Sequence, residues 1–305
     1  MQGAIITVIR GGLGNQLFMY AAARALALRT GRRLYLDTRH GFVNDPYRRS
    51  YALGDFPVHA EVMPQAWRIA PSLRHPRHRL VRALSRTLPR RYRSYLAQKE
   101  DSDESQLTGL MPKPVRVTLV GYWQSERYFT SHSDMIQREC MPPPPAGVFN
   151  AALGRGMEAC DSVFVHVRRL GYTAALPASY YRDALDVIAG RVARPRFYLF
   201  GDDLAWARSQ IDFGHWPVTV VDQNGRDPLA DLWLMTRCRH AVVANSSFSW
   251  WGAWLGGRGQ REVIFPSDPG FPLSRAAGWD TVDSRMRPVA TASGSPAAAP
   301  RRTAA

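Results

Sequence analysis

The stretch RHAVVANSSFSWWGAWL, residues 239–255, combines a strand, a polar turn and an aromatic helix in that order. The apolar run 241–244 is typical of a buried strand. Asn245, Ser246 and Ser247 follow it, and such residues start helices because their side chains accept hydrogen bonds from backbone N–H groups. A helix start of this kind can bind phosphate. Taken alone, however, the stretch is better explained as a capped core helix packed through its tryptophans.

The N-terminal end of the chain has a complementary pattern. Residues 4–9 form an apolar β-branched run, residues 10–16 read RGGLGNQ, and a helical stretch rich in Ala and Leu follows from Leu17 to Arg29. A strand, a glycine loop and a helix make the first unit of a doubly wound sheet. The loop imitates a dinucleotide-binding fingerprint, but Leu17 stands where the third glycine belongs. A nicotinamide or flavin enzyme is therefore a poor alternative.

Composition bounds the class of protein. The 305 residues suffice for two domains, and the 45% hydrophobic content supports a core in each. We find neither an apolar run long enough to span a membrane nor the pattern of a signal peptide. Three widely spaced cysteines without metal-ligand spacing, Cys140, Cys160 and Cys238, fit a reducing compartment. We therefore expect a cytoplasmic protein.

The net charge of +15 is concentrated in one segment. Residues 68–93 contain nine arginines and no acid, while Leu80, Leu84 and Leu88 recur every four residues. This pattern predicts a basic amphipathic helix in an insertion covering about 62–100, suited to peripheral contact with the anionic inner face of the cytoplasmic membrane. The alternatives are a solvated arginine face and contact with nucleic acid; we expect no nucleic-acid partner.

Four consecutive prolines in MPPPPAG, residues 141–147, mark a domain boundary, because proline interrupts helices and sheets alike. We predict an N-terminal Rossmann-like domain over 1–145 and a second series of alternating strands and helices over 146–283. The low-complexity tail 284–305 is predicted to be disordered.

Charged residues gather at the ends of predicted strands in the second domain. One strand ends at His166, Arg168 and Arg169, and the planar fork of arginine suits phosphate. The next ends at Asp202 and Asp203, whose carboxylates suit a nucleoside. Carboxyl ends of parallel strands share one edge of a sheet. Together with the Asn-Ser-Ser turn, these residues predict a nucleotide-diphosphate pocket, although a surface salt-bridge network of the same four charged residues is an alternative.

A loop in the first domain carries chemistry suited to a sugar. Residues 121–129, GYWQSERYF, follow a predicted strand at 115–120. Tyr122, Trp123 and Gln124 combine aromatic rings with a hydrogen-bonding amide, which matches the apolar faces and polar edges of a pyranose. The alternative is that the rings belong to the core.

Six motifs together resemble a known family, the bacterial α-1,2-fucosyltransferases of glycosyltransferase family eleven. They occur in the family's order, and the similarity runs from residue 5 to about 266. The motifs are GGLGNQLF at 11–18, GYWQSERYF at 121–129, HVRR at 166–169, FGDD at 200–203, DLWLM at 231–235 and NSSFSWWGAW at 245–254. The resemblance implies a GT-B-like α/β fold, with two Rossmann-like domains facing across a cleft and the N-terminal one on the acceptor side.

The resemblance also implies a reaction and its residues. Fucose would pass from GDP-β-L-fucose to the 2-hydroxyl of a terminal galactoside with inversion, without metal or other cofactor. Arg168 and Arg169 would stabilise the departing GDP, and Tyr122, Trp123 and Gln124 would contact the acceptor. The expected donor-binding residues are His166, Arg168, Arg169, Asp202, Asp203, Asn245, Ser246, Ser247, Gly12, Gly14, Asn15 and Gln16.

One departure from the family pattern concerns the general base. The family commonly carries an acid two residues after the arginine pair, but this chain has Leu170 and Gly171 there. Glu126 and Asp37 are candidate replacements, with Glu126 the preferred catalytic residue. Alternatively, a donor phosphate oxygen takes the proton. A degenerate, non-catalytic module that binds a nucleotide sugar or an anionic surface is the competing hypothesis.

Overall fold

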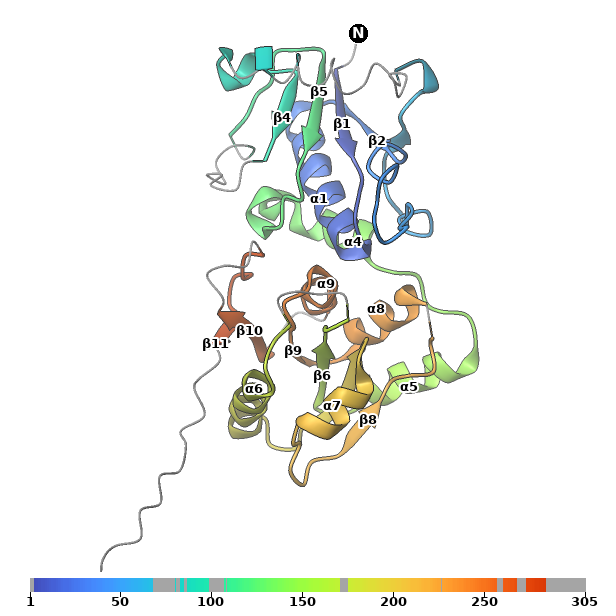
Figure 1. The fold of residues 1–305 in the computed structure, drawn as a ribbon, viewed down its shortest axis with the longest axis vertical. Helices are drawn as coiled ribbons and strands as arrows, with labels where there is room; N and C mark the ends of the chain where they lie inside the picture. The colour runs from blue at the N-terminus through green and yellow to red at the C-terminus, as the bar shows by residue number, and fades with distance from the viewer. Residues whose placement is uncertain are drawn as a thin grey trace, which may run out of the picture.

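The computed structural model describes residues 3–67, 80, 83–84, 87–98, 107, 109–170, 175–225, 227–256, 260–267 and 273–283. It contains two parallel sheets in separate halves of the molecule, one above the other in Figure 1. The predicted tail 284–305 and residues 68–79, 81–82 and 85–86 of the predicted basic helix lie outside the described residues. No helix within the described ranges is long and apolar enough to cross a membrane.

The N-terminal sheet has the strand order β3-β2-β1-β5-β4, and every pair is parallel. Apolar residues of β1 are buried on both faces because helices and loops cover both sides of the sheet. The strands are β1 (Ala4–Val8), β2 (Arg33–Asp37), β3 (Glu61–Val62), β4 (Tyr95–Ala97) and β5 (Arg116–Val120). The helices are α1 (Leu13–Thr30) and α4 (Ser133–Cys140), with single turns η1 (Gln65–Trp67), η2 (Arg90–Tyr92), η3 (Glu126–Tyr128) and η4 (Thr130–His132).

The C-terminal sheet has the order β11-β10-β9-β6-β7-β8, again with parallel pairs. Its central strand β6 is buried along its whole length. Its strands are β6 (Ser162–Val167), β7 (Arg196–Gly201), β8 (Val218–Val220), β9 (His240–Val242), β10 (Val263–Ser267) and β11 (Asp280–Asp283). Its helices are α5 (Val148–Glu158), α6 (Ala178–Arg191), α7 (Leu204–Gln210), α8 (Pro228–Arg237) and α9 (Ser247–Leu255).

The tetraproline segment links α4 of the first half to α5 of the second. The predicted helix at 17–29 in fact begins four residues earlier, so Leu13 to Gln16 form its first turn instead of a loop. Gly11 precedes it with a φ of +74°, a conformation that glycine adopts without strain. This early start brings the amino end of α1 to the other half of the molecule.

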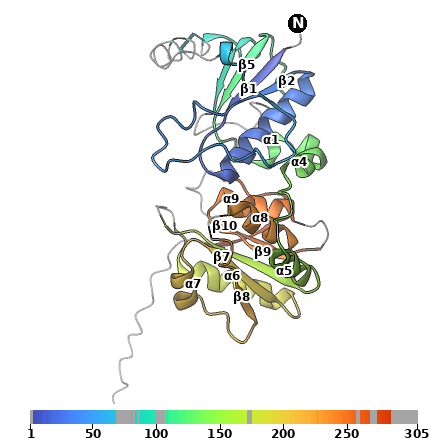
Figure 2. The same ribbon diagram turned by 90° about the vertical axis from the view of Figure 1, so that its right-hand side faces the viewer.

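Helix α9 packs directly against α1 across the junction of the two halves (Figure 2). Phe18 of α1 lies 4.5 Å from the ring of Trp250 and 5.0 Å from that of Trp251. Phe129 stacks on Trp251 at 5.7 Å between ring centroids. Buried residues of both sheets consequently belong to one hydrophobic cluster. The tryptophans that the sequence assigns to packing thus fix one domain on the other.

Candidate functional site

A cavity of about 790 Å³ opens between the two domains. It lies where the carboxyl ends of β6 and β7 and the amino ends of α1, α8 and α9 meet. Ligand sites of open α/β sheets lie beyond the carboxyl ends of the strands. Predicted site residues that line it are Gly12, Gly14, Asn15, Gln16, Tyr122, Gln124, His166, Arg168, Asp202, Ser246 and Ser247.

The amino ends of α1 and α9 touch at the floor of the cavity. The Ser247 hydroxyl donates to the Asn15 side-chain oxygen at 2.8 Å, and the Gln124 amide donates to that same oxygen at 2.8 Å. The Trp251 indole donates to the carbonyl of Gly14 at 3.0 Å. Residues predicted to bind the donor therefore also hold the two walls of the cavity together.

The two adjacent arginines after β6 face different surroundings. Arg168 lines the cavity and pairs with Asp202 at 2.5 Å between Nη1 and Oδ2. The Arg169 guanidinium instead lies 3.8 Å from the ring centroid of Trp206, with its Nε 3.5 Å from an oxygen of Asp203. Neither Arg169 nor Asp203 lines the cavity. The salt-bridge network considered from the sequence is thus present, but one of its two pairs forms part of the cavity wall.

His166 is a buried ring in the same wall. Its Nδ1 has no hydrogen-bond partner within the described part of the chain. Burial, followed by the charge of Arg168, lowers the pKa of His166 to about 3. The imidazole is therefore neutral at ordinary pH, and its Nδ1 is a buried polar atom without a partner in the described part of the chain.

The amino end of α8 adds two carboxylates to the cavity. Asp231 opens the DLWLM motif but was given no role from the sequence, and Asp227 belongs to no motif. Asp227 caps the helix by accepting from the backbone N–H of Leu229 at 3.0 Å. Asp231 accepts from the side chain of Asn224 at 2.8 Å. Burial raises the pKa of Asp231 to about 6. The sequence Asp-Pro at 227–228 is a helix-start signal that could have drawn attention to this wall.

The loop after β2 supplies the remaining part of the N-terminal wall, and the sequence analysis missed it altogether. Tyr47, Arg49, Ser50 and Ala52 line the same cavity as His166 and Arg168 at the carboxyl end of β6. This loop has neither hydrophobic periodicity nor a recognisable motif. Its contribution follows only from its position in the folded chain.

Several predicted residues lie away from the cavity lining. Trp123 is buried against Tyr128, with 5.4 Å between ring centroids, as a core residue would be. Asn245 is likewise buried before the start of α9. Leu170, which stands before the position of the family's acid, is exposed to solvent, and Gly171 lies outside the described residues.

The two candidate bases have structural partners instead of access to the cavity. The carboxylate of Glu126 accepts from the Trp254 indole at 3.1 Å and from the backbone N–H of Ala277. Asp37 accepts from the backbone N–H of His40 at 3.0 Å and interacts with the His40 ring. Glu126 thus stabilises the domain junction and Asp37 a local turn. Neither carboxylate lines the cavity in which a general base would act.

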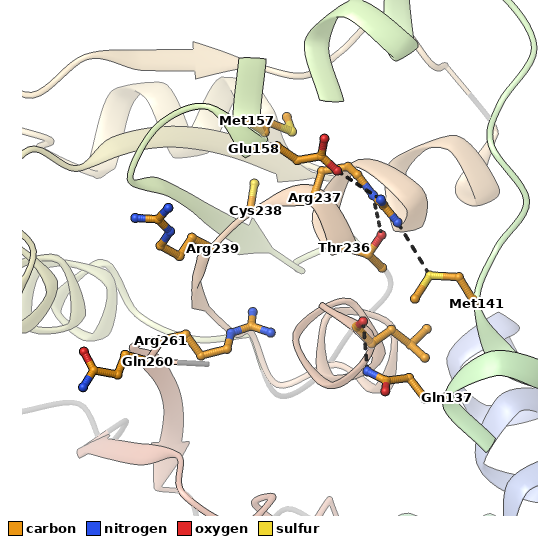
Figure 3. A pocket seen from close by; sticks show the side chains of 11 residues that line it. Gln137, Met141, Met157, Glu158, Thr236, Arg237, Cys238, Arg239, Gln260 and Arg261 are labelled. Carbon is orange, nitrogen blue, oxygen red and sulfur yellow. Dashed lines mark hydrogen bonds and ion pairs between the residues drawn. The ribbon is translucent and has the colours of Figure 1, made fainter. Parts of the chain in front are cut away.

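A second cavity of about 640 Å³ lies near the carboxyl ends of α8 and α9 (Figure 3). Three arginines line it, and each has a partner within the protein. Arg237 pairs with Glu158 at 3.1 Å, Arg239 pairs with Asp161 at 2.6 Å, and Arg261 donates to the carbonyl of Ala253 at 2.9 Å. None of the predicted site residues lines this space. The interdomain cavity is therefore the candidate site.

Comparison with solved structures supports the fold. The fucosyltransferase NodZ from Bradyrhizobium superimposes with a TM-score of 0.52 at 17% identity, covering 84% of this chain and 94% of that one. The predicted GT-B-like arrangement of two facing Rossmann-like domains is confirmed.

Sequence comparison identifies the family. The alpha-1,2-colitosyltransferase of Escherichia coli is 29% identical over 267 residues, covering 82% of this chain and 87% of that protein. The galactoside 2-alpha-L-fucosyltransferase SEC1 of Bos taurus is 26% identical over 272 residues, covering 84% and 66%. The family model described as glycosyl transferase family 11 matches residues 4–275, which include both walls of the cavity. With the sequence motifs, the two facing sheets and this match in agreement, the chain belongs to glycosyl transferase family 11.

Proposed function

We propose that the protein is an inverting galactoside α-1,2-fucosyltransferase that uses GDP-β-L-fucose. The observation that carries the proposal is the position of Arg168, which lines the cavity shared by the two domains together with the amino end of α9. A guanidinium and a helix amino end both favour negative charge. This pair of features suits a diphosphate, which is what a nucleotide-sugar donor presents.

The leaving group gains negative charge as the reaction proceeds. The bond between fucose C1 and the donor phosphate oxygen breaks, and its electrons remain on GDP. Preorganised positive charge near that oxygen stabilises the transition state more than the ground state. Asp202 holds Arg168 through one ion pair, which fixes its guanidinium before the donor arrives. No metal ion is needed in this scheme.

The acceptor hydroxyl must lose a proton as it attacks C1 from the face opposite the phosphate. The carboxylates among the described lining residues are Asp202, Asp227 and Asp231, and all belong to the C-terminal wall. Asp202 is already paired with Arg168. We therefore assign a loose, oxocarbenium-like transition state, in which the C1–O bond is largely broken before the new bond forms. The acceptor's proton then passes through water to an oxygen of the diphosphate, which becomes more basic as the C1–O bond breaks. Water carries the proton because the hydroxyl and the phosphate lie on opposite faces of C1.

Asp231 and His166 are suited to bind the guanine ring of the nucleotide. Guanine presents its N1–H and its exocyclic amino group side by side, and an ionised carboxylate can accept from both. Protonation of Asp231, whose pKa is about 6, removes that ability as the pH falls through this value. The KM for GDP-fucose is expected to rise about tenfold between roughly pH 7 and pH 5, since one unit below its pKa about a tenth of a carboxyl remains ionised.

Steady-state kinetics over this pH range test the role of Asp231. The variant Asp231→Asn should have a raised KM at neutral pH and no further rise on acidification. Asp212→Asn, an equivalent change on the exposed loop after α7, is the control. A KM of Asp231→Asn that equals the wild-type value at neutral pH would contradict the assignment.

The experiment that tests the whole proposal incubates the protein with GDP-fucose and a panel of β-galactosides, with and without chelator. We expect an α-1,2-linked fucoside by NMR in both conditions. Transfer to no galactoside, or transfer only from another nucleotide sugar, would refute the proposal. Tight GDP binding without turnover would instead support the alternative of a non-catalytic binding module.

One sequence relative suggests a second donor to test. The 29% identical relative is an alpha-1,2-colitosyltransferase, and colitose differs from fucose by a missing hydroxyl. GDP-colitose should therefore be assayed beside GDP-fucose. The donor with the higher kcat/KM is the one that this chain uses.

We further propose that the protein acts at the inner face of the cytoplasmic membrane. Leu80, Leu84 and Leu88 are exposed by 60%, 59% and 45% of their surface, at the spacing of one helix face. Arg90 and Arg91 follow in η2 and are exposed as well. Apolar side chains with adjacent cations suit an anionic lipid surface.

Vesicle cosedimentation measures this attachment. We expect binding to phosphatidylglycerol vesicles and little binding to phosphatidylcholine. The double variant Leu84→Ser/Leu88→Ser should bind at least about tenfold more weakly, because burying each leucine contributes roughly 1.5 kcal/mol or more. Equal binding by variant and wild type would remove these leucines from any membrane contact.

A further inference from the structure

The turn from Asp45 to Ser50 in the loop after β2 has a defined internal structure. The Asp45 carboxylate accepts from the backbone N–H of Tyr47 at 2.9 Å and from that of Arg49 at 3.3 Å. The Asp45 carbonyl accepts from the N–H of Arg48 at 3.0 Å. Arg48 itself has a φ of +51°, which is unusual for a residue with a side chain. The turn is thus held in a conformation that its own sequence does not favour.

Gln16 fastens this turn to the start of α1. Its amide nitrogen donates to the carbonyls of Gly11 and Ser50, both at 2.9 Å, and its oxygen accepts from the N–H of Ala52 at 2.9 Å. The side chain is buried. Two of these hydrogen bonds attach the loop, and the third, to Gly11, holds the Gln16 amide at the start of its own helix. The motif at 11–18 predicted instead that Gln16 binds the donor.

The attached turn presents two side chains to the cavity. Tyr47 and Arg49 both line it, and the guanidinium of Arg49 lies 4.2 Å from the centroid of the Tyr47 ring. The ring of Tyr122, which also lines the cavity, lies 4.6 Å from the guanidinium carbon of Arg10 in a similar arrangement. Tyr47 is 57% exposed, so its ring is not fixed in the core. An open ring with adjacent N–H donors is a surface on which a pyranose can lie.

We propose that the turn 45–50 is the acceptor-selecting element, with Tyr47 and Arg49 as its specificity-determining residues and Asp45 and Gln16 as positioning residues. This proposal rests on the proposed transferase function. The Tyr47 ring contacts the apolar face of an acceptor sugar, and Arg49 donates to that sugar's oxygens. Strained backbone retained beside a cavity is typical of a functional site. The opposite wall, with Arg168 and His166, is left to the nucleotide.

The test compares acceptor and donor constants in variants of adjacent residues. Arg49→Gln and Tyr47→Ala are expected to raise the acceptor KM by about tenfold or more, as loss of a charged hydrogen bond or a stacked ring does. The Kd for GDP should stay within about twofold of wild type, since neither residue lies on the nucleotide wall. Arg48→Gln, which makes the same change one position earlier and outside the cavity lining, should alter neither constant.

Positioning is tested separately from contact. Asp45→Asn keeps the size of the side chain but weakens its hold on the two N–H groups, and should raise the acceptor KM without changing GDP affinity. Tyr47→Phe retains the ring and should resemble wild type. An unchanged acceptor KM in both Arg49→Gln and Tyr47→Ala would overturn the proposal, as would an equal change in the Kd for GDP.

Failure of the proposed function gives a different result. If the wild-type protein transfers no sugar to any acceptor, no acceptor KM can be measured. Binding of a β-galactoside to the GDP-saturated protein is then measured by saturation-transfer NMR. Loss of that signal in Arg49→Gln, with its retention in Arg48→Gln, supports the acceptor surface independently of turnover. Equal signals in both variants overturn it.

Discussion

Replacing Arg168 with glutamine is expected to lower kcat/KM for transfer by about a hundredfold to a thousandfold, the cost of removing one preorganised group from a developing anion. Arg168 is the arginine of the pair that lines the cavity. Its side chain is 34% exposed, and its ion-pair partner Asp202 is 20% exposed, so water can solvate the carboxylate left behind. We therefore expect the fold to survive. Thermal unfolding of the variant should confirm that loss of activity is not loss of structure.

The matched control is Arg169→Gln, an identical change at the next position. Arg169 stacks on Trp206 and lies near Asp203, outside the cavity lining. Loss of this cation–π contact should cost about 1 kcal/mol of stability, with less than about a tenfold effect on kcat/KM. Measured side by side, the two variants separate a diphosphate contact from a structural contact. Equal losses of activity in both, or full activity in Arg168→Gln, would refute this division.

The arginine pair also shows where sequence reasoning ends. Strand alternation with helices predicts the parallel sheets, and the principle that ligands lie beyond strand carboxyl ends predicts that His166 and Arg168 face a cavity. The same pattern assigns both arginines to the diphosphate. Which guanidinium turns toward the cavity depends on Asp203, which caps α7, and on Trp206 in the first turn of that helix. The orientation of each guanidinium is set by these tertiary contacts, and the local motif does not predict it.

The proposed acceptor-selecting turn 45–50 could not be predicted from the sequence for a related reason. Tyr47 and Arg49 lie in a loop without periodicity, and their position depends on Gln16, more than 30 residues earlier. By contrast, the aromatic loop at 121–129 was predicted as one acceptor-binding motif, but only some of its residues line the cavity. Tyr122 and Gln124 line the cavity, whereas Trp123 belongs to the core and Glu126 binds the Trp254 indole. Adjacent residues of one motif point to different sides, so a motif identifies a region more reliably than a side chain.

Substitution of Gly14 by alanine is expected to push the start of α9 away from α1 at the junction of the two domains. A Cβ at Gly14 would lie 2.5 Å from the carbonyl carbon of Ser247 and 2.6 Å from the backbone nitrogen of Phe248. Both are backbone atoms at the start of α9, so no side-chain rotation relieves the clash. Helix α9 must move away from α1, and the hydrogen bond from the Trp251 indole to the Gly14 carbonyl is strained. The predicted phosphate-binding helix end then leaves its place opposite the acceptor wall.

The expected consequences are a loss of stability and of catalysis together. Overpacking of this kind costs about 1 to 3 kcal/mol, which corresponds to a fall in Tm of roughly 2 to 12 °C. A shift of about 1 Å between the two walls should lower kcat/KM by about a hundredfold. Thermal unfolding and steady-state kinetics on the same preparation measure both effects.

Gly156 in α5 provides the control. The same substitution at this helical position adds a Cβ that meets nothing within 4 Å. Gly156→Ala should leave activity unchanged and raise stability by about 0.5 to 1 kcal/mol, since alanine favours helix over glycine. Gly14→Ala gains the same helical preference, so any fall in its Tm understates the cost of the clash. If both variants are stabilised and active, the contact between α1 and α9 does not set the geometry of the cavity. Opposite signs in the two Tm shifts would show that Gly14 is required for close approach of the two domains rather than for helix flexibility.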